Sequence, residues 1–151
     1  MTGIAESPED IADSMDAMES LDADQVRVMS FVPQEGTPMQ HVAAPPPTRE
    51  LVIIALLRLA FPDRLIPASL DVAGLAGLRQ RLDAGANVIT SIVPPGEGLA
   101  GVANNSLDID NGGRTVNAIR PVLESCNLRA ASQDDYLAWI ANRKRPSCLS
   151  A

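Results

Sequence analysis

Aromatic residues are nearly missing from this chain of 151 residues, in which Phe, Trp and Tyr make up 3%. Because 46% of the residues are nevertheless hydrophobic, the composition predicts a globular protein with an aliphatic core. Only two cysteines are present, Cys126 and Cys148, and their spacing matches no metal or redox motif. We therefore expect two ordinary thiols in a reducing compartment, which predicts a cytoplasmic protein.

Positive charge and long apolar runs are scarce as well. The chain carries 12 Lys and Arg against 19 Asp and Glu, a formal net charge of −7, which argues against binding a nucleic-acid backbone or an anionic membrane surface. The longest apolar run, Leu51 to Leu57, is far shorter than the roughly 20 residues that span a bilayer. No charged segment followed by an apolar segment opens the chain. We therefore expect neither secretion nor a nucleic-acid or membrane partner.

Helix and strand signals alternate along the chain, which predicts an α/β fold with a parallel sheet. Ser7 and Thr48 are expected to cap the first two helices. Typical (β/α)₈ barrels need about 250 residues, so we interpret the chain as part of a larger barrel, with a small open α/β domain as the alternative. Strands are expected at 26–32, 65–72 and 87–93, and helices from residue 8 onward and at 49–61, 75–83, 116–126 and 134–143.

Polar side chains break the apolar pattern of these strands. Ser69 and Asp71 fall on one face of their strand, and Arg27 interrupts an apolar strand in the same way. One explanation is structural, an ion pair between Arg27 and Asp71. The other is a clamp for a zwitterion, in which Arg27 binds a carboxylate and Asp71 accepts from an ammonium group. The clamp would suit an α-amino acid.

A glycine-rich segment and two hydroxyl residues lie at or near the end of the last predicted strand. Gly96 to Gly101 spell G-x-G-x-x-G, which we interpret as a loop at the carboxyl end of a strand rather than a dinucleotide fingerprint, because two prolines intervene. Thr90 and Ser91 lie in the last strand, and one of them is expected to face inward.

Three longer runs of sequence carry a family resemblance: 26–34 together with 36–39, 61–72, and 85–95. They resemble the methylornithine synthases of the radical S-adenosylmethionine superfamily, and the likeness covers most of the chain. The opening residues Gly3 to Glu6 are similar to the tail of a glycine- and glutamate-containing motif of that superfamily. Biotin synthase and the hydrogenase-maturation enzymes resemble the chain more distantly.

The resemblance implies a fold, an activity and a site. Residues 1–103 would be the C-terminal portion of a (β/α)₈ barrel, and residues 104–151 a helical extension that closes it. The family binds S-adenosylmethionine and a [4Fe-4S] cluster, and converts L-lysine to 3-methylornithine in pyrrolysine biosynthesis through a 5′-deoxyadenosyl radical. By resemblance, Arg27, Ser69 and Asp71 hold the charged groups of the amino acid, and Glu6 lies near the cofactor.

The sequence departs from this family at one point, the cluster motif. The three cluster cysteines, spaced C-x₃-C-x₂-C, have no counterpart, because Cys126 and Cys148 are far apart. Without these thiolates there is no cluster to reduce the cofactor, so we expect this sequence alone to be inactive. It would be a fragment, or one part of a split enzyme completed by an N-terminal half-barrel chain. A different biotin-synthase-like radical enzyme and a non-catalytic half-barrel binding module stay open as alternatives.

Overall fold

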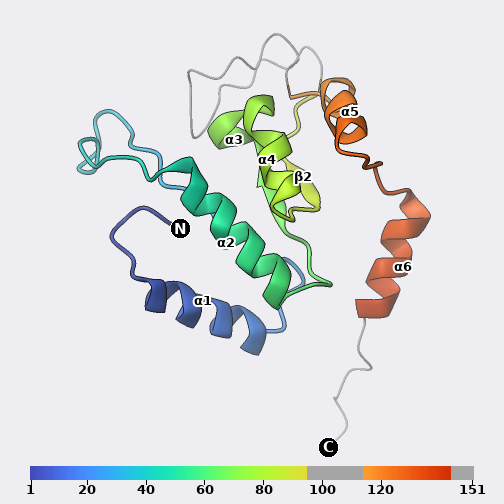
Figure 1. Cartoon of the computed structure of the whole chain (residues 1–151), viewed down its shortest axis with the longest axis horizontal. Coiled ribbons are helices and arrows are strands. Elements are labelled where there is room, and N and C mark those ends of the chain that lie inside the picture. Colours follow the sequence, from blue (N-terminus) through green and yellow to red (C-terminus); the bar gives the residue numbers. More distant parts are fainter. Residues whose placement is uncertain (95–113, 144–151) are drawn as a thin grey trace, which may run out of the picture.

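Residues 1–94 and 114–143 are described in the computed structural model of the chain (Figure 1). The boundary predicted at residues 103 and 104, the loop 96–101 and Cys148 lie outside the described residues. The helices and strands, in order, are α1 (Pro8–Ser20), α2 (Pro47–Ala60), β1 (Pro67–Ser69), α3 (Leu70–Ala73), the 3₁₀ turn η1 (Leu75–Gly77), α4 (Leu78–Asp83), β2 (Val88–Thr90), α5 (Val116–Ser125) and α6 (Gln133–Arg143).

The strands are parallel and form one wall. β1 pairs with β2 in a register that places Ala68 opposite Ile89. Single parallel bridges extend this pairing, from Leu65 to Gln25 and from Ser30 to Thr2. Within the described residues the wall therefore has the order residue 2, segment 25–30, β1, β2, with all four segments running the same way. This arrangement agrees with the predicted parallel α/β fold.

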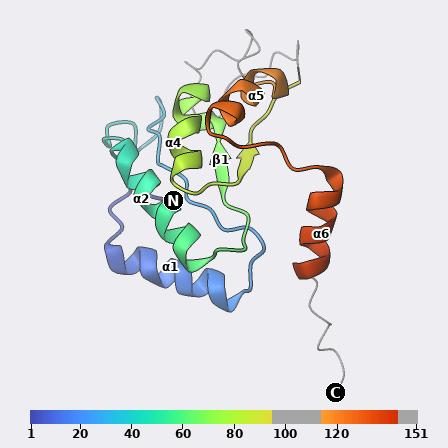
Figure 2. The ribbon, with the colours of Figure 1, turned by 45° about the vertical axis from the view of Figure 1, so that its right-hand side comes forward.

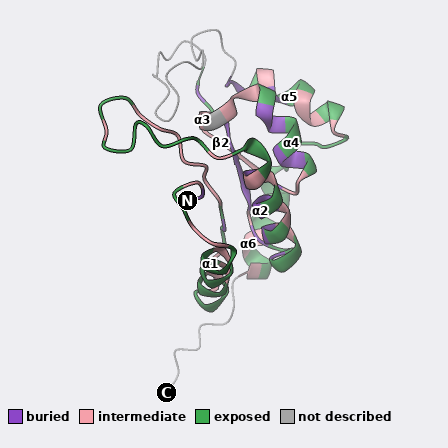
Figure 3. Ribbon diagram, turned by 60° about the vertical axis from the view of Figure 1, so that its left-hand side comes forward, coloured by how far each residue is buried: buried purple, intermediate pink, exposed green. Residues whose placement is uncertain are grey.

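An aliphatic core lies between this wall and one layer of helices. Ile66 and Ala68 of the β1 region are fully buried, as is Ile54 of α2. Leu78 of α4 and Ile119 of α5 complete the same cluster. Figure 3 shows the buried stretches along the strands and on the sides of α2 and α4 that face them, whereas α1 is largely exposed. The aliphatic core expected from the scarcity of aromatics is thus confirmed.

Capping explains where the first two helices begin. Ser7 caps α1 as expected, because its hydroxyl accepts from the Asp10 backbone N–H at 3.1 Å while Asp10 accepts from the Ser7 N–H at 2.7 Å. The cap expected from Thr48 is wrong. The N-cap of α2 is Pro46, without a side-chain hydrogen bond, and Pro47 starts the helix. Proline suits this position because its fixed φ is helical and it has no N–H to satisfy.

All three predicted strands are shorter than expected, and the one predicted over 87–93 is β2 (Val88–Thr90). The segment 26–32 contributes an isolated bridge at Ser30 rather than a regular strand. The strand predicted over 65–72 ends at Ser69, because the Ser69 side chain accepts from the Asp71 N–H and so starts helix α3. Asp71 therefore lies in the first turn of a helix and not on a strand.

A buried ion pair joins the wall to two helices. Arg81 of α4 donates to Glu50 of α2 through Nε at 2.9 Å and through Nη2 at 3.1 Å, and both side chains are nearly inaccessible. Ser30 of the wall donates to the same carboxylate at 2.7 Å. The third guanidinium nitrogen donates to the Gly77 carbonyl at 3.2 Å. The pair is fully hydrogen-bonded, as a buried pair needs to be.

The last helix, α6, lies apart from α1 and α2 in two views of the molecule (Figures 1 and 2). Its contacts with the remainder are polar: Trp139 Nε1 donates to the Asp63 carbonyl at 2.9 Å, and Arg143 pairs with Asp24 at 2.7 Å. Tyr136 and Leu137 of this helix are half exposed. Among the described helices, none combines the length and the apolar character that crossing a bilayer requires.

Gly77 tests the importance of the buried ion pair. A Cβ at this position would lie 2.4 Å from Arg81 Nη1 and 2.6 Å from the Ala73 Cβ. We expect Gly77→Ala to displace Arg81 and to lower the free energy of unfolding by about 1–3 kcal/mol, the usual cost of overpacking. The measurement is chemical denaturation of the complete protein. Ala76→Ser, at an exposed neighbour, is the control, and equal stability of both variants would contradict the prediction.

Candidate functional site

A cluster of polar side chains lies where β1 and β2 end. Ser69 is the last residue of β1, Asp71 lies in α3, Ser91 directly follows β2, and Arg114 precedes α5. The carboxyl ends of parallel strands are the edge at which barrel enzymes build their sites. The position of the cluster therefore makes it the candidate site of the described chain.

The Asp71 carboxylate is the centre of this cluster. Its Oδ1 accepts from Arg114 Nη1 at 2.7 Å, and its Oδ2 accepts from the Ser91 hydroxyl at 2.5 Å. Ser69 lies 3.2 Å from Ser91, hydroxyl to hydroxyl, and 3.4 Å from Asp71 Oδ2. Each carboxylate oxygen thus has one strong donor.

The backbone around Ser91 is strained to place its hydroxyl. Ser91 has a φ of +65°, in the left-handed region that side chains other than glycine seldom adopt. Such a conformation persists only where the surroundings impose it, and it is most frequent at functional sites. Here it brings the Ser91 hydroxyl onto the Asp71 carboxylate in the first turn of α3.

Burial and charge act on Asp71 in opposite directions. Burial raises the pKa of the Asp71 carboxyl, but the hydrogen bonds from Ser91 and Arg114 and the guanidinium charge outweigh it, so the pKa lies below its ordinary value. Asp71 is therefore ionised at neutral pH. About a quarter of its side chain is exposed, against 5% for Arg114. The site thus presents a fixed negative charge with one side open.

The cluster also contains buried donors that the described residues leave unpaired. Arg114 Nε and Nη2 and Thr90 Oγ1 are inaccessible and have no hydrogen-bond partner there. Most buried polar groups in folded proteins do have one. The buried polar groups of this cluster therefore have fewer hydrogen-bond partners than those of the buried pair Glu50–Arg81.

The residues predicted from sequence fall into two groups in the structure. Ser69 and Asp71 are brought together, but Asp71 pairs with Arg114, so the ion pair between Arg27 and Asp71 is not formed. Arg27 is exposed, next to Val26, which is buried under the helices. Since side chains alternate along an extended segment, Arg27 lies on the face of the wall opposite the helices. Its role in binding stays a prediction.

Two members of the cluster, Ser91 and Arg114, were not predicted as site residues from the sequence. Ser91 carried a signal, because one of Thr90 and Ser91 had to face inward. Arg114 carried none, since it lies 43 residues from Asp71 and outside any predicted strand or helix.

Both carboxylate oxygens of Glu6 accept hydrogen bonds from within the chain. Its carboxylate accepts from the Thr2 hydroxyl, from the Gly3 N–H at 2.8 Å and from the Ile4 N–H at 2.9 Å, and it pairs with Arg49 at 2.8 Å. The Thr2 hydroxyl and the Gly3 and Ile4 amides hold the pKa of the Glu6 carboxyl well below its usual range. The chain itself thus occupies both Glu6 oxygens, and the cofactor contact predicted for this residue remains untested.

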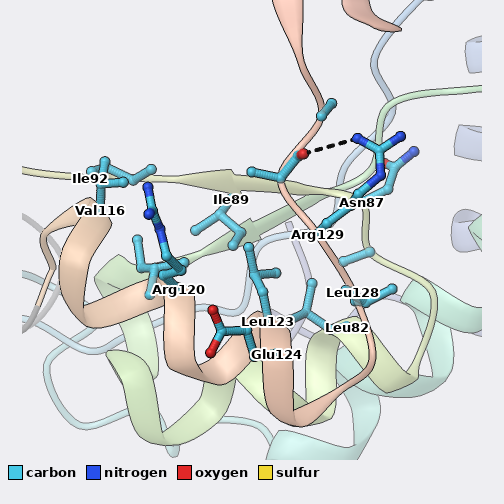
Figure 4. A pocket seen from close by; sticks show the side chains of 14 residues that line it. Leu82, Asn87, Ile89, Ile92, Val116, Arg120, Leu123, Glu124, Leu128 and Arg129 are labelled. Atoms are coloured by element: carbon cyan, nitrogen blue, oxygen red, sulfur yellow. Dashed lines mark hydrogen bonds between the residues drawn. The ribbon is translucent and has the colours of Figure 1, made fainter.

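A second concavity is apolar and lies beside β2 (Figure 4). Its volume is about 650 Å³. It is formed by β2, α5, the end of α4 and the segment after α5, and its apolar lining includes Leu82, Ile89, Ile92, Val116, Leu123 and Leu128. Ile92, Val116 and Leu128 are all more than two fifths exposed. This pocket lies at the strand that ends the described wall.

No metal site is present among the described residues. They contain no group of three His, Cys, Asp or Glu side chains that could bind an ion. Cys126, the cysteine within this part of the chain, is free and half-buried. Because the whole sequence has two cysteines, it cannot supply the three thiolates of the expected cluster motif.

Comparison with known proteins gives three informative likenesses. The chain is 44% identical over 140 residues to the 3-methylornithine synthase of Methanosarcina barkeri, which is 93% of this chain and 40% of that protein. It is 43% identical over 136 residues to the Methanosarcina acetivorans protein of the same name, 90% of this chain and 39% of that one. Biotin synthase of Streptomyces coelicolor is 38% identical over 63 residues, 42% of this chain and 16% of that enzyme. No model of a protein family matches the chain.

The structure gives the same result. It matches the crystal structure of methylornithine synthase (PylB) with a TM-score of 0.83 and 44% identity, over 91% of this chain and 41% of that chain. The sequence therefore spans about two fifths of the length of these relatives, at their C-terminal part. The resemblance noted in the sequence is confirmed, and so is the fold, part of a parallel α/β barrel.

The ionisation of Asp71 gives a testable pH dependence. Because the pKa of folded Asp71 is lowered, its ionised form stabilises the fold above the ordinary aspartate pKa of 3.8, and this contribution is lost as the pH falls through the folded pKa. We expect Asp71→Asn to be less stable than the wild type at pH 6, with the difference shrinking below pH 4. Urea unfolding of the complete protein across this range measures it. A difference that does not change with pH would contradict the prediction.

Proposed function

We propose that this chain, which is similar in sequence and fold to about two fifths of the methylornithine synthases, supplies the C-terminal barrel wall of an enzyme that converts L-lysine to 3-methylornithine for pyrrolysine biosynthesis. The observation that carries the proposal is the ionised, oriented Asp71 at the carboxyl ends of β1 and β2, in a chain 44% identical to named 3-methylornithine synthases. A cytoplasmic location belongs to the same proposal.

The substrate presents charges that match the residues of the wall. Lysine carries an ammonium group and a carboxylate at its α-carbon. Asp71 can accept from the ammonium group on its open side, and the Ser69 hydroxyl, 3.4 Å from Asp71 Oδ2, can add a further hydrogen bond. Arg27, which is exposed on the face away from the helices, can bind a carboxylate through two parallel hydrogen bonds. Together they would fix both ends of the amino-acid group.

The radical chemistry belongs to residues outside this sequence. Reductive cleavage of S-adenosylmethionine by a [4Fe-4S] cluster would supply the hydrogen-abstracting radical, but two separated cysteines do not fit such a cluster. We therefore assign to this chain the binding and orientation of the amino acid. The remaining three fifths of the relatives' length would hold the cluster.

Another biotin-synthase-like radical enzyme is the competing function, favoured by the 38% identity to biotin synthase over 63 residues. The Asp71 cluster would then bind a different substrate with a positive charge. A substrate series on the complete protein separates the two, because a methylornithine synthase is expected to act on L-lysine and not on the sulfur-free precursor of biotin. A half-barrel without catalytic function would convert neither.

The role of Asp71 is tested by Asp71→Ala in the complete protein. Removing the carboxylate is expected to weaken lysine binding by at least ~10-fold, which corresponds to the loss of one charge-assisted hydrogen bond. Isothermal titration with lysine measures the affinity, and the iron content verifies cluster assembly. Asp83→Ala, at an exposed position of α4, is the control. Unchanged lysine affinity in Asp71→Ala would remove this residue from the site.

The open wall also implies a partner segment. The outer edge of β2 has no paired strand among the described residues, and the apolar pocket of about 650 Å³ lies beside it. Unpaired strand edges promote aggregation. An N-terminal half-barrel, on the same polypeptide or on a separate one, would pair with β2 and cover Ile92, Val116 and Leu128.

This partner is tested by expression of the chain alone and together with the first three fifths of a Methanosarcina relative. We expect the isolated chain to aggregate and the co-expressed chains to elute as a one-to-one complex in size-exclusion chromatography. Ile92→Glu, which charges the rim of the pocket, is expected to abolish the complex, and Leu59→Glu, at an exposed site on α2, to leave it intact. A monomeric isolated chain with a cooperative melt would contradict the prediction.

A further inference from the structure

The structure assigns to Arg114 and Ser91 the role of positioning residues, which hold the Asp71 carboxylate in the one orientation that leaves it open to a substrate ammonium group. This inference rests on the proposed function, since it names two residues that prepare the same site. Neither residue was among those expected to bind the substrate.

The contacts fix Asp71 from two directions. Arg114 Nη1 binds Oδ1 at 2.7 Å, and the Ser91 hydroxyl binds Oδ2 at 2.5 Å. A carboxylate with one donor on each oxygen cannot rotate without breaking both hydrogen bonds. Oδ2 also lies 3.4 Å from the Ser69 hydroxyl, whereas Oδ1 keeps a second acceptor position. The exposed quarter of the Asp71 side chain is where a ligand can reach it.

The guanidinium of Arg114 is less fully hydrogen-bonded than that of the buried pair Glu50–Arg81, and it leaves two buried nitrogens unpaired where Arg58 and Arg64 each leave one. Arg81 uses Nε, Nη1 and Nη2 in hydrogen bonds to Glu50 and Gly77. Arg114 is as deeply buried, yet only Nη1 is bonded, and Nε and Nη2 have no partner among the described residues. Unsatisfied buried donors destabilise a fold. The chain tolerates this cost at the place where the guanidinium orients Asp71.

Ser91 gives the same indication independently. Its φ of +65° is readily adopted by glycine and disfavoured for serine. Glycine would adopt this backbone conformation without strain, but it has no hydroxyl. The hydroxyl is the group that contacts both Asp71 and Ser69. The strained backbone at Ser91 therefore accompanies a hydroxyl that donates to the Asp71 carboxylate.

The strained position offers a variant that separates structure from function. Ser91→Gly removes the hydroxyl and at the same time relieves the backbone. We expect its melting temperature to equal or exceed that of the wild type, while the KM for lysine rises by roughly 3- to 10-fold, as expected for one hydrogen bond. Loss of stability in parallel with activity would instead point to a structural role and overturn the assignment of Ser91.

Arg114→Gln tests the guanidinium in the complete protein with its cluster. We expect the KM for lysine to rise by at least ~10-fold, with partial rescue in Arg114→Lys, which keeps the charge but not the planar fork. Arg81→Gln is the matched control for loss of a buried guanidinium, and Arg79→Gln for loss of an exposed one. Arg81→Gln is expected to lower stability and leave KM within twofold of the wild type.

A second readout does not depend on lysine. The Asp71 carboxyl can be titrated by carbon-13 NMR in the substrate-free protein, where Arg114→Gln is expected to raise its pKa, because the contacting cation is lost while burial remains. An unchanged Asp71 pKa and an unchanged KM would overturn the inference, and so would a raised pKa with unchanged KM. A wild type that neither binds nor converts lysine would refute the proposed function, and the titration would still decide whether Arg114 controls Asp71.

Discussion

The buried ion pair between Glu50 and Arg81 is the contact on which the described architecture depends. It links α2 to α4, and Ser30 of the wall donates to the same carboxylate. A buried charge without a partner is strongly destabilising, so this contact stabilises the packing of the two helices and the wall segment against one another. α4 also contacts β1, and it follows α3 and η1 in the chain.

Four of the described carboxylates, Glu6, Asp10, Asp71 and Asp135, have lowered pKa values, and Glu6 and Asp71 differ in what is left for a ligand. The oxygens of Glu6 are occupied by a hydroxyl, two backbone amides and Arg49. Asp71 has two strong donors and an open side. A low pKa alone therefore does not mark a binding group, because hydrogen bonds from within the chain produce the same effect. The open coordination of Asp71 distinguishes the two.

The sequence allowed the fold to be predicted where local physics and family likeness agreed. The capping box at Ser7, the aliphatic core and the parallel wall follow from residue patterns that the structure confirms. The proximity of Ser69 and Asp71 was also predicted, but for the wrong reason. Alternation along a strand was assumed, whereas Ser69 ends the strand and caps α3, which brings Asp71 close through a helical turn.

The part that could not be predicted depends on long-range contacts. Arg114 reaches Asp71 across 43 residues of sequence, and no local pattern indicates which cation will pair with a given carboxylate. Thr48 failed as a cap because the preceding prolines begin the helix without a side-chain donor or acceptor. The Arg114 contact lies outside the window that a sequence pattern covers, whereas the Thr48 error concerns the prolines directly beside it.

The location of the Asp71 cluster at the carboxyl ends of β1 and β2, the last two strands of the described wall, has a thermodynamic consequence. Ser91 directly follows β2, whose outer edge is also the seam at which a barrel of this family would be joined to its other part. A ligand held at such a seam binds the joined form more tightly than the separated one, so occupancy and assembly reinforce each other by mass action. A bound amino acid would then also strengthen the association between the two parts of the barrel.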